Sequence, residues 1–134
     1  RNIFMIAFFG QKKKKKILII DDDSSLRGLL RAILEEDHFH FEEAPDGEVG
    51  LEAVIKVKPD LIILDIMMPH MSGWDVLQTL RSNPQTIKIP ILMLSAKETL
   101  GDVERSLALG AHDYVQKPFD HSRLRQKVQH LLST

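Results

Sequence analysis

The sequence predicts an α/β fold in which a parallel five-stranded sheet is covered by helices on both faces. The chain has 134 residues, of which 43% are hydrophobic and 28% are charged, and this is the size and balance of one compact domain. From Lys16 onward, short apolar runs alternate five times with segments whose apolar residues have helical spacing. The first, third and fourth runs contain only apolar residues, as expected of strands buried on both faces.

The first two strand and helix pairs lie between residues 17 and 57. Ile17–Ile20 forms an all-apolar strand, and a helix with one apolar face follows, for which we expect Ser24 to be the N-cap. Residues 38–43 form a second strand whose half-polar composition predicts a position at the sheet edge. Residues 45–47, with the sequence Pro-Asp-Gly, then turn the chain into a helix that continues to Val57.

The remaining three pairs follow the same pattern. Strands are predicted at residues 61–64, 91–94 and 112–115. The first of the three helices has its apolar face at Trp74, Leu77 and Leu80. The second has Val103 and Leu107 on its apolar face and is expected to stop at Gly110. The third is expected to be capped by Asp120, and its apolar face contains Leu124, Val128, Leu131 and Leu132.

Charge is distributed unevenly along the chain. Residues 1–16 contain six bases and no acid, whereas residues 17–134 contain 12 bases and 19 acids. The absence of cysteine excludes disulfides, thiolate metal sites and a cysteine nucleophile, and it favours a reducing, cytoplasmic location.

The first 16 residues are predicted to be a leader outside the folded domain, which would occupy residues 17–134. The apolar run Ile3–Phe9 is shorter than the about 20 residues that span a bilayer, and its lysines follow the run, the reverse of a secretory signal. Because the chain begins with Arg1, we expect an upstream remnant or a non-native, disordered segment. A second hypothesis is a weak membrane-surface anchor made of the apolar run and the lysines.

Polar residues follow the predicted strands at the points where they end. Asp21, Asp22 and Asp23 follow the first strand, Asp65 the third, Ser95 the fourth and Lys117 the fifth. The carboxyl ends of parallel strands share one edge of a sheet, and right-handed crossovers allow the first and third strands to be neighbours. The sequence therefore predicts one pocket of acids, a hydroxyl and an amine.

This set of groups favours magnesium and phosphoryl chemistry. Two carboxylates about 4 Å apart repel by roughly 4 kcal/mol at an effective dielectric constant of about 20, so a cluster of three needs a cation. Oxygen ligands favour a hard ion such as Mg²⁺. With a serine and a lysine beside it, such a site suits a transferring phosphoryl group, and one carboxylate could act as the nucleophile.

Four fragments in order resemble a response-regulator receiver domain: ILIIDDD, LIILDIMMPHMSG around Asp65, ILMLSAK around Ser95 and GAHDYVQKPF around Lys117. The resemblance implies a flavodoxin-like (βα)5 fold, a doubly wound three-layer sandwich with strand order 2-1-3-4-5. It also implies a cis Lys117–Pro118 bond. The implied function is a signalling phosphoacceptor without an external turnover substrate.

The resemblance assigns a role to each residue of the pocket. Asp65 is expected to accept a phosphoryl group from a histidine kinase or a histidine phosphotransfer protein. Asp22, Asp65 and the backbone carbonyl of Met67 would bind Mg²⁺, with Asp21 acting through a water. Lys117 would pair with a phosphoryl oxygen.

Ser95 and Tyr114 are expected to form the switch that carries the change to the surface of the fourth helix, fifth strand and fifth helix. The partners would be the kinase and a downstream output protein or fused domain, without direct nucleic-acid binding by this chain. A phosphorylation-dependent homodimer is a further option, although exposed pairs such as Asp113 and Lys127 are weak support for one. Since the sequence ends after the last helix, either a single-domain regulator or a receiver from a larger protein fits.

Several alternatives remain open at this point. Asp23 is expected to be a surface acid or a cap of the first helix, and a metal chelate by His38 and His40 lacks a third ligand. A haloacid-dehalogenase-type phosphatase, a flavin-binding domain and a phosphorylation-independent interaction module are the competing functions. Met67 lies two residues past Asp65, and Lys97 lies two residues past Ser95. Because the Met67 side chain has no polar group to orient an attacking water, we expect slow loss of the phosphoryl group from Asp65.

Overall fold

The computed structural model describes residues 13–96 and 100–134. Its strands are β1 (Lys16–Ile20), β2 (His40–Ala44), β3 (Leu61–Asp65), β4 (Ile91–Ser95) and β5 (Asp113–Gln116). Its helices are α2 (Ser24–Leu34), the 3₁₀ turn η1 (Glu35–Asp37), α3 (Gly47–Val57), α4 (Gly73–Arg81), α5 (Leu100–Ala108) and α6 (His121–Leu132).

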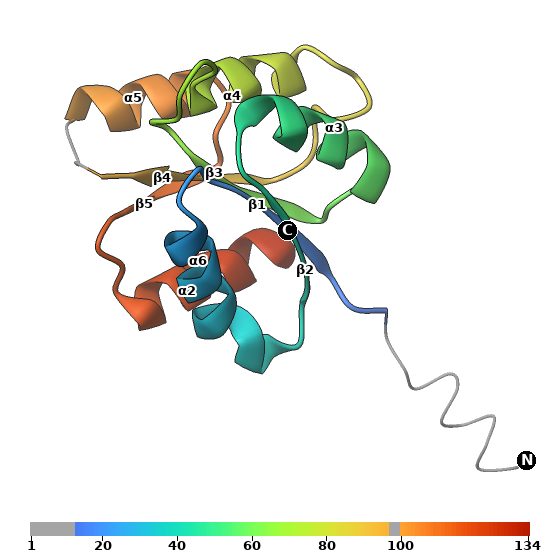
Figure 1. The fold of residues 1–134 in the computed structure, drawn as a ribbon, viewed down its shortest axis with the longest axis vertical. Coiled ribbons are helices and arrows are strands. Elements are labelled where there is room, and N and C mark those ends of the chain that lie inside the picture. The colour runs from blue at the N-terminus through green and yellow to red at the C-terminus, as the bar shows by residue number, and fades with distance from the viewer. Residues whose placement is uncertain (1–12, 97–99) are drawn as a thin grey trace, which may run out of the picture.

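The five strands form one parallel sheet in the order β2-β1-β3-β4-β5. Helices α3, α4 and α5 cover one face of this sheet, and α2 and α6 cover the other (Figure 1). The predicted fold class, strand order and edge position of β2 are therefore confirmed. β1 and β3 are neighbours, and this places the ends of both strands at the same point of the sheet edge.

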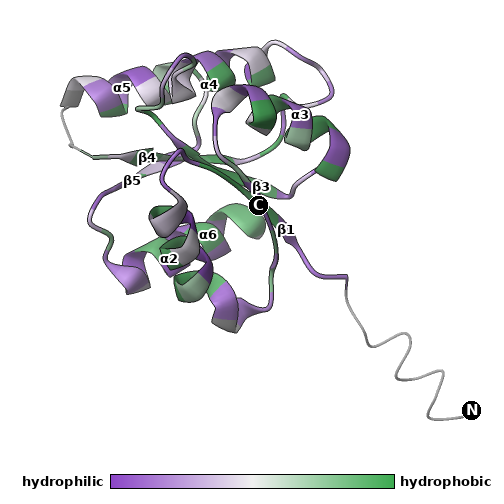
Figure 2. Cartoon of the chain, viewed as in Figure 1, coloured by the Kyte–Doolittle hydropathy of each residue, from purple (hydrophilic) through white to green (hydrophobic). Residues whose placement is uncertain are grey.

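Alternating side chains of the strands build two hydrophobic cores. In β1, Leu18 and Ile20 pack toward α3 and α4, whereas Ile17 and Ile19 pack toward α2 and α6. The apolar strands lie between helices that carry both hydrophobic and hydrophilic residues (Figure 2). Burial of each such side chain contributes about 1.5–3 kcal/mol, so the central strands form a rigid support for the residues that follow them.

The structure decides the cap of the first helix and corrects the start of the second strand. Asp23, one of the two predicted caps, is the N-cap of α2 in place of Ser24, because the Asp23 carboxylate accepts hydrogen bonds from the backbone N–H groups of Ser25 and Leu26. The second strand begins at His40 rather than at residue 38. His38 ends the η1 turn in a left-handed conformation with φ of 57°, so it cannot continue a strand.

No helix within the described residues is long and apolar enough to cross a bilayer. The leader prediction falls largely on residues 1–12, which lie outside the described residues. Lys16 already belongs to β1, where its backbone N–H donates to the Asp60 carboxylate at 2.7 Å.

Candidate functional site

Three carboxylates meet at the carboxyl ends of the central strands. Asp21 directly follows β1, and Asp65 is the last residue of β3. Asp21 is fully buried and Asp65 is 3% exposed, while Asp22 is open to solvent. One oxygen from each of the three side chains lies within 4.8 Å of the others. The predicted acidic pocket is present, and below it is called the acidic pocket: Asp21, Asp22 and Asp65.

Lys117 reaches into the acidic pocket from the loop after β5. Its Nζ lies 3.0 Å from Oδ1 of Asp65 and 3.3 Å from Oδ2 of Asp21. Its backbone N–H donates to the Ser95 carbonyl at 2.7 Å, and the Lys117–Pro118 bond is cis, as the resemblance implied. The lysine thus bridges two carboxylates that come from strands far from its own in the sequence.

Burial and charge perturb the protonation of these groups. Burial, and then the charge of Asp21, raises the pKa of Asp65 to about 6, against the opposing effect of Lys117. Burial also raises the pKa of Asp21, although the backbone N–H of Asp23 stabilises its ionised form. Burial acts to lower the pKa of Lys117, but the hydrogen bonds and charges of Asp65 and Asp21 together outweigh this effect and raise it.

The residues of the acidic pocket fit a hard divalent cation. Three carboxylates face one ammonium group, so ionising all of them leaves uncompensated negative charge, which adds to the effect of burial on the pKa of Asp65. The donors are oxygens, the ligand type that Mg²⁺ prefers. Within the described residues, this is the only group of three or more acidic, histidine or cysteine side chains placed to share an ion, so a chelate at His38 and His40 finds no support.

The two residues of the predicted switch lie on β4 and β5, the last two strands of the sheet. Ser95 is buried at the end of β4, next to β3 in the sheet, and is 5% exposed. Tyr114 lies on β5, half-buried against the α3 and α4 side of the core, with Nζ of Lys127 4.7 Å from its ring centroid. The structure therefore places both residues of the predicted switch on the two strands that lead from the pocket to the sheet edge.

Comparison with known proteins identifies the family. The sequence profile of the response regulator receiver domain matches residues 17–129. The chain belongs to the receiver-domain family of response regulators. A receiver domain is a signalling module of two-component systems, so the phosphatase and flavin-binding alternatives are set aside.

Individual relatives agree with this assignment. The transcriptional regulatory protein HprR of Escherichia coli is 43% identical over 96 residues, covering 72% of this chain and 42% of HprR. A protein of Chloroflexus aurantiacus described as a response regulator has a TM-score of 0.87 at 31% identity, covering 91% of this chain and all of that one. The chemotaxis protein CheY4 of Vibrio cholerae has a TM-score of 0.83 at 30% identity, covering 89% and 99%. The receiver domain thus spans less than half of the curated relative HprR.

Two residues near the pocket of this receiver domain escaped the sequence analysis. Gly73 begins α4 and packs directly against the backbone of Asp65, where a Cβ would overlap the Asp65 carbonyl oxygen. Arg27 in α2 donates to the Asp21 carbonyl at 2.7 Å. Both act on the backbone of acidic residues, and no local sequence signal reports such contacts. The backbone carbonyl of Met67, whose side chain is 72% exposed, stays a predicted ligand, and Lys97 lies outside the described residues.

Proposed function

We propose that this receiver domain accepts a phosphoryl group on Asp65 from the phosphohistidine of a histidine kinase or phosphotransfer protein, assisted by Mg²⁺. The observation that carries the proposal is the bridge of Lys117 Nζ to Asp21 and Asp65 within a cluster of three carboxylates. A structural ion pair would need one acid for one lysine. The additional acids are explained if a cation joins them.

Asp65 is the group suited to nucleophilic attack. It is held at the end of a fully buried strand, and its Oδ1 is paired with Lys117. A carboxylate oxygen would attack the phosphorus while the P–N bond to the histidine breaks, and the imidazole leaves with the electron pair of that bond. Lys117 is placed to bind a phosphoryl oxygen, because its Nζ already lies beside the attacking group.

The metal would be held by Asp22, Asp65 and the backbone carbonyl of Met67, with Asp21 contributing through a water. When bound, Mg²⁺ would offset the negative charge of the phosphoryl oxygens. Asp22 is the exposed member of the acidic pocket, so it leaves the site open to solvent and to a partner.

Ser95 and Tyr114 would carry the change outward. A hydroxyl at the end of β4 can turn to bond a phosphoryl oxygen on the neighbouring Asp65, and Tyr114 on β5 would follow inward. The responding surface would be that of α5, β5 and α6, read by an output protein or a fused domain. Asp113 and Lys127 pair within one chain at 2.9 Å, so they give no support to a homodimer.

The proposal is tested by incubating the protein with acetyl phosphate and Mg²⁺ and measuring intact mass. We expect a gain of one phosphoryl mass in the wild type, and none in Asp65→Asn or in the presence of EDTA. Glu52→Gln, which changes an exposed acid in α3, is the control and should be phosphorylated normally. An equal gain in Asp65→Asn, or no gain in the wild type, would favour a phosphorylation-independent interaction module.

A further inference from the structure

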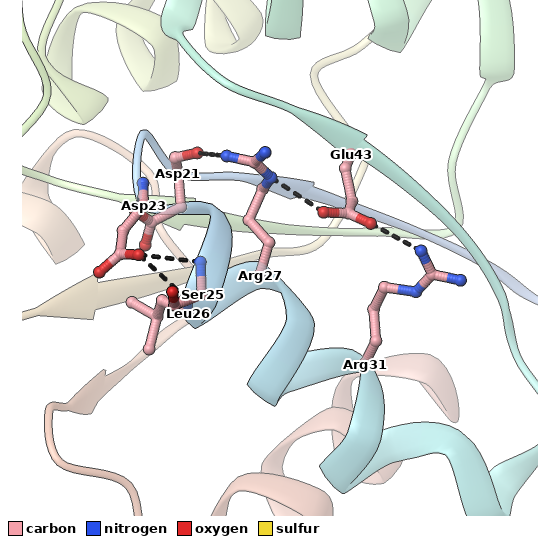
Figure 3. A network of polar contacts seen from close by, with 7 residues as sticks. All are labelled: Asp21, Asp23, Ser25, Leu26, Arg27, Arg31 and Glu43. Atoms are coloured by element: carbon pink, nitrogen blue, oxygen red, sulfur yellow. Dashed lines mark hydrogen bonds and ion pairs between the residues drawn. The ribbon is translucent and has the colours of Figure 1, made fainter.

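Arg27 connects the turn after β1 to the neighbouring strand β2 (Figure 3). It lies in the first turns of α2, and its Nη1 donates to the carbonyl of Asp21 at 2.7 Å. Its Nε donates to Oε1 of Glu43 at 2.9 Å. One guanidinium therefore binds the backbone of the acidic pocket and a side chain of β2 at the same time.

Glu43 is itself firmly held, so it is a fixed support for Arg27. Its second oxygen, Oε2, accepts from Nη1 of Arg31 at 2.7 Å. The hydrogen bond from Arg31 is the largest of the effects that lower the pKa of Glu43, and Arg27 acts in the same direction. The Arg27 side chain is 14% exposed and that of Glu43 is 28% exposed, so this pairing is partly shielded from water.

The carbonyl that Arg27 binds belongs to the peptide unit joining Asp21 to Asp22. The two neighbouring peptide units are also hydrogen-bonded. In the unit before it, the N–H of Asp21 donates to the Ala44 carbonyl at 3.2 Å, and in the unit after it, the N–H of Asp23 donates to Oδ1 of Asp21 at 2.9 Å. The hydrogen bond from Arg27 therefore adds to a turn whose flanking peptide units already have hydrogen-bond partners. The orientation of the unit sets where the exposed Asp22 carboxylate lies relative to Asp21 and Asp65.

We propose that Arg27 is a positioning residue for the cation of the acidic pocket, which it serves by fixing the peptide unit between Asp21 and Asp22. The inference rests on the proposed Mg²⁺ site. Without Arg27 the Asp21 carbonyl would lose its charged donor, and the turn could rotate. The ligand carboxylates would then have to be ordered when the metal binds, and this ordering weakens affinity.

Arg31 provides a matched control. Both arginines lie in α2, carry the same charge and bind opposite oxygens of Glu43, but only Arg27 contacts the Asp21 carbonyl. Arg31 also lies over the Phe41 ring at 5.7 Å, so its loss removes packing as well as an ion pair. A general effect of lost charge, or of a weaker contact between α2 and β2, should therefore appear whether Arg27 or Arg31 is replaced.

The test measures Mn²⁺ affinity by electron paramagnetic resonance of the free ion, with Mg²⁺ as competitor, in the phosphate-free protein. We expect Arg27→Gln to lower the affinity of the protein for both ions by about tenfold. This is the lower end of the effect of groups that orient metal ligands. Arg31→Gln should change the affinity by less than about twofold, and the melting temperatures of both variants are measured beside it, so that a loss of stability is separated from a loss of affinity. Arg27→Lys should be intermediate, because an ammonium lacks the two-sided fork of arginine.

Equal affinities in Arg27→Gln and wild type, or equal losses in the Arg27 and Arg31 variants, would overturn the positioning role while leaving the metal site intact. No binding by the wild type would overturn both this inference and the proposed Mg²⁺ site. If Arg27→Gln does not fold, the comparison of Arg27→Lys with Arg31→Lys decides in the same way.

Discussion

Gly73 lies so close to Asp65 that any side chain at residue 73 would overlap the Asp65 carbonyl oxygen. The backbone N–H of Gly73 also donates to the Ile66 carbonyl at 2.8 Å, so the start of α4 is bound to the loop that carries the acceptor. The glycine is required here because of this close approach, and not because of an unusual backbone conformation.

Gly73→Ala should therefore destabilise the protein by about 1–3 kcal/mol, since a methyl group is forced into filled space. Urea unfolding measures this loss. Gly28→Ala is the control: a Cβ at Gly28 meets nothing within 4 Å, so this change should stabilise α2 by about 0.5–1 kcal/mol. A fully stable Gly73→Ala protein would contradict the described packing of α4 on Asp65.

Asp65→Asn should stabilise the metal-free protein at neutral pH. The pKa of Asp65 is about 6 in the folded protein, against an ordinary value of 3.8 that applies to the unfolded chain. The stability that protonated Asp65 contributes is therefore fully present below pH 3.8 and is lost as the pH rises through 6. At pH 7 the ionised group costs at most about 3 kcal/mol, which asparagine avoids.

The advantage of Asp65→Asn should shrink as the pH is lowered from 7 toward 5, and saturating Mg²⁺ should reduce it at pH 7 by stabilising the wild type. Thermal unfolding at each pH, with and without the metal, measures both effects. A difference between the two proteins that does not vary with pH would contradict the raised pKa of Asp65.

Trp74, the only tryptophan in the sequence, should report movement of α5. Its indole N–H donates to Oγ of the buried Ser106 at 3.1 Å, and the Arg105 guanidinium lies 4.0 Å from its ring centroid. Phosphorylation of the wild type should change Trp74 fluorescence. Ser95→Ala, compared at the same phosphorylated fraction, should lose most of this change, because the hydroxyl that follows the phosphoryl group is gone. An undiminished change in Ser95→Ala would exclude Ser95 from the switch.

Met67→Asn should shorten the lifetime of the acyl phosphate. Met67 is 72% exposed beside the acidic pocket, and its side chain offers no polar group to orient an attacking water. We expect about a tenfold faster loss, below the ~100-fold that a well-aligned general base gives. The decay of the phosphorylated mass measures it, with Met67→Leu as a control of unchanged lifetime. An equal or longer lifetime in Met67→Asn would refute this role of residue 67.

The fold and the acidic pocket were predictable because their signals are local. A run such as Leu61–Leu64 is apolar on both faces, and a parallel sheet brings the residue after each run to one edge. Asp21, Asp65 and Lys117 could therefore be placed together although up to 96 residues separate them.

Contacts between polar side chains and distant backbone atoms could not be predicted in this way. Arg27 and Glu43 lie on half-polar segments where many pairings are equally compatible with the sequence, and only the packed fold selects one. The close approach of Gly73 to Asp65 depends in the same way on how the loop after β3 returns to α4. The sequence left both Asp23 and Ser24 as caps of α2 because aspartate and serine cap helices about equally well, and the structure selects Asp23.

The most direct test of the phosphoacceptor role is to locate the phosphoryl group on the chain. The wild type is phosphorylated with acetyl phosphate and Mg²⁺ and treated with borohydride, which reduces an aspartyl phosphate to homoserine, and the peptides are sequenced by mass spectrometry. The account predicts reduction at residue 65 alone. Reduction at Asp21 or Asp22, or a phosphoryl group that resists borohydride because it is attached to a serine or histidine, would contradict it.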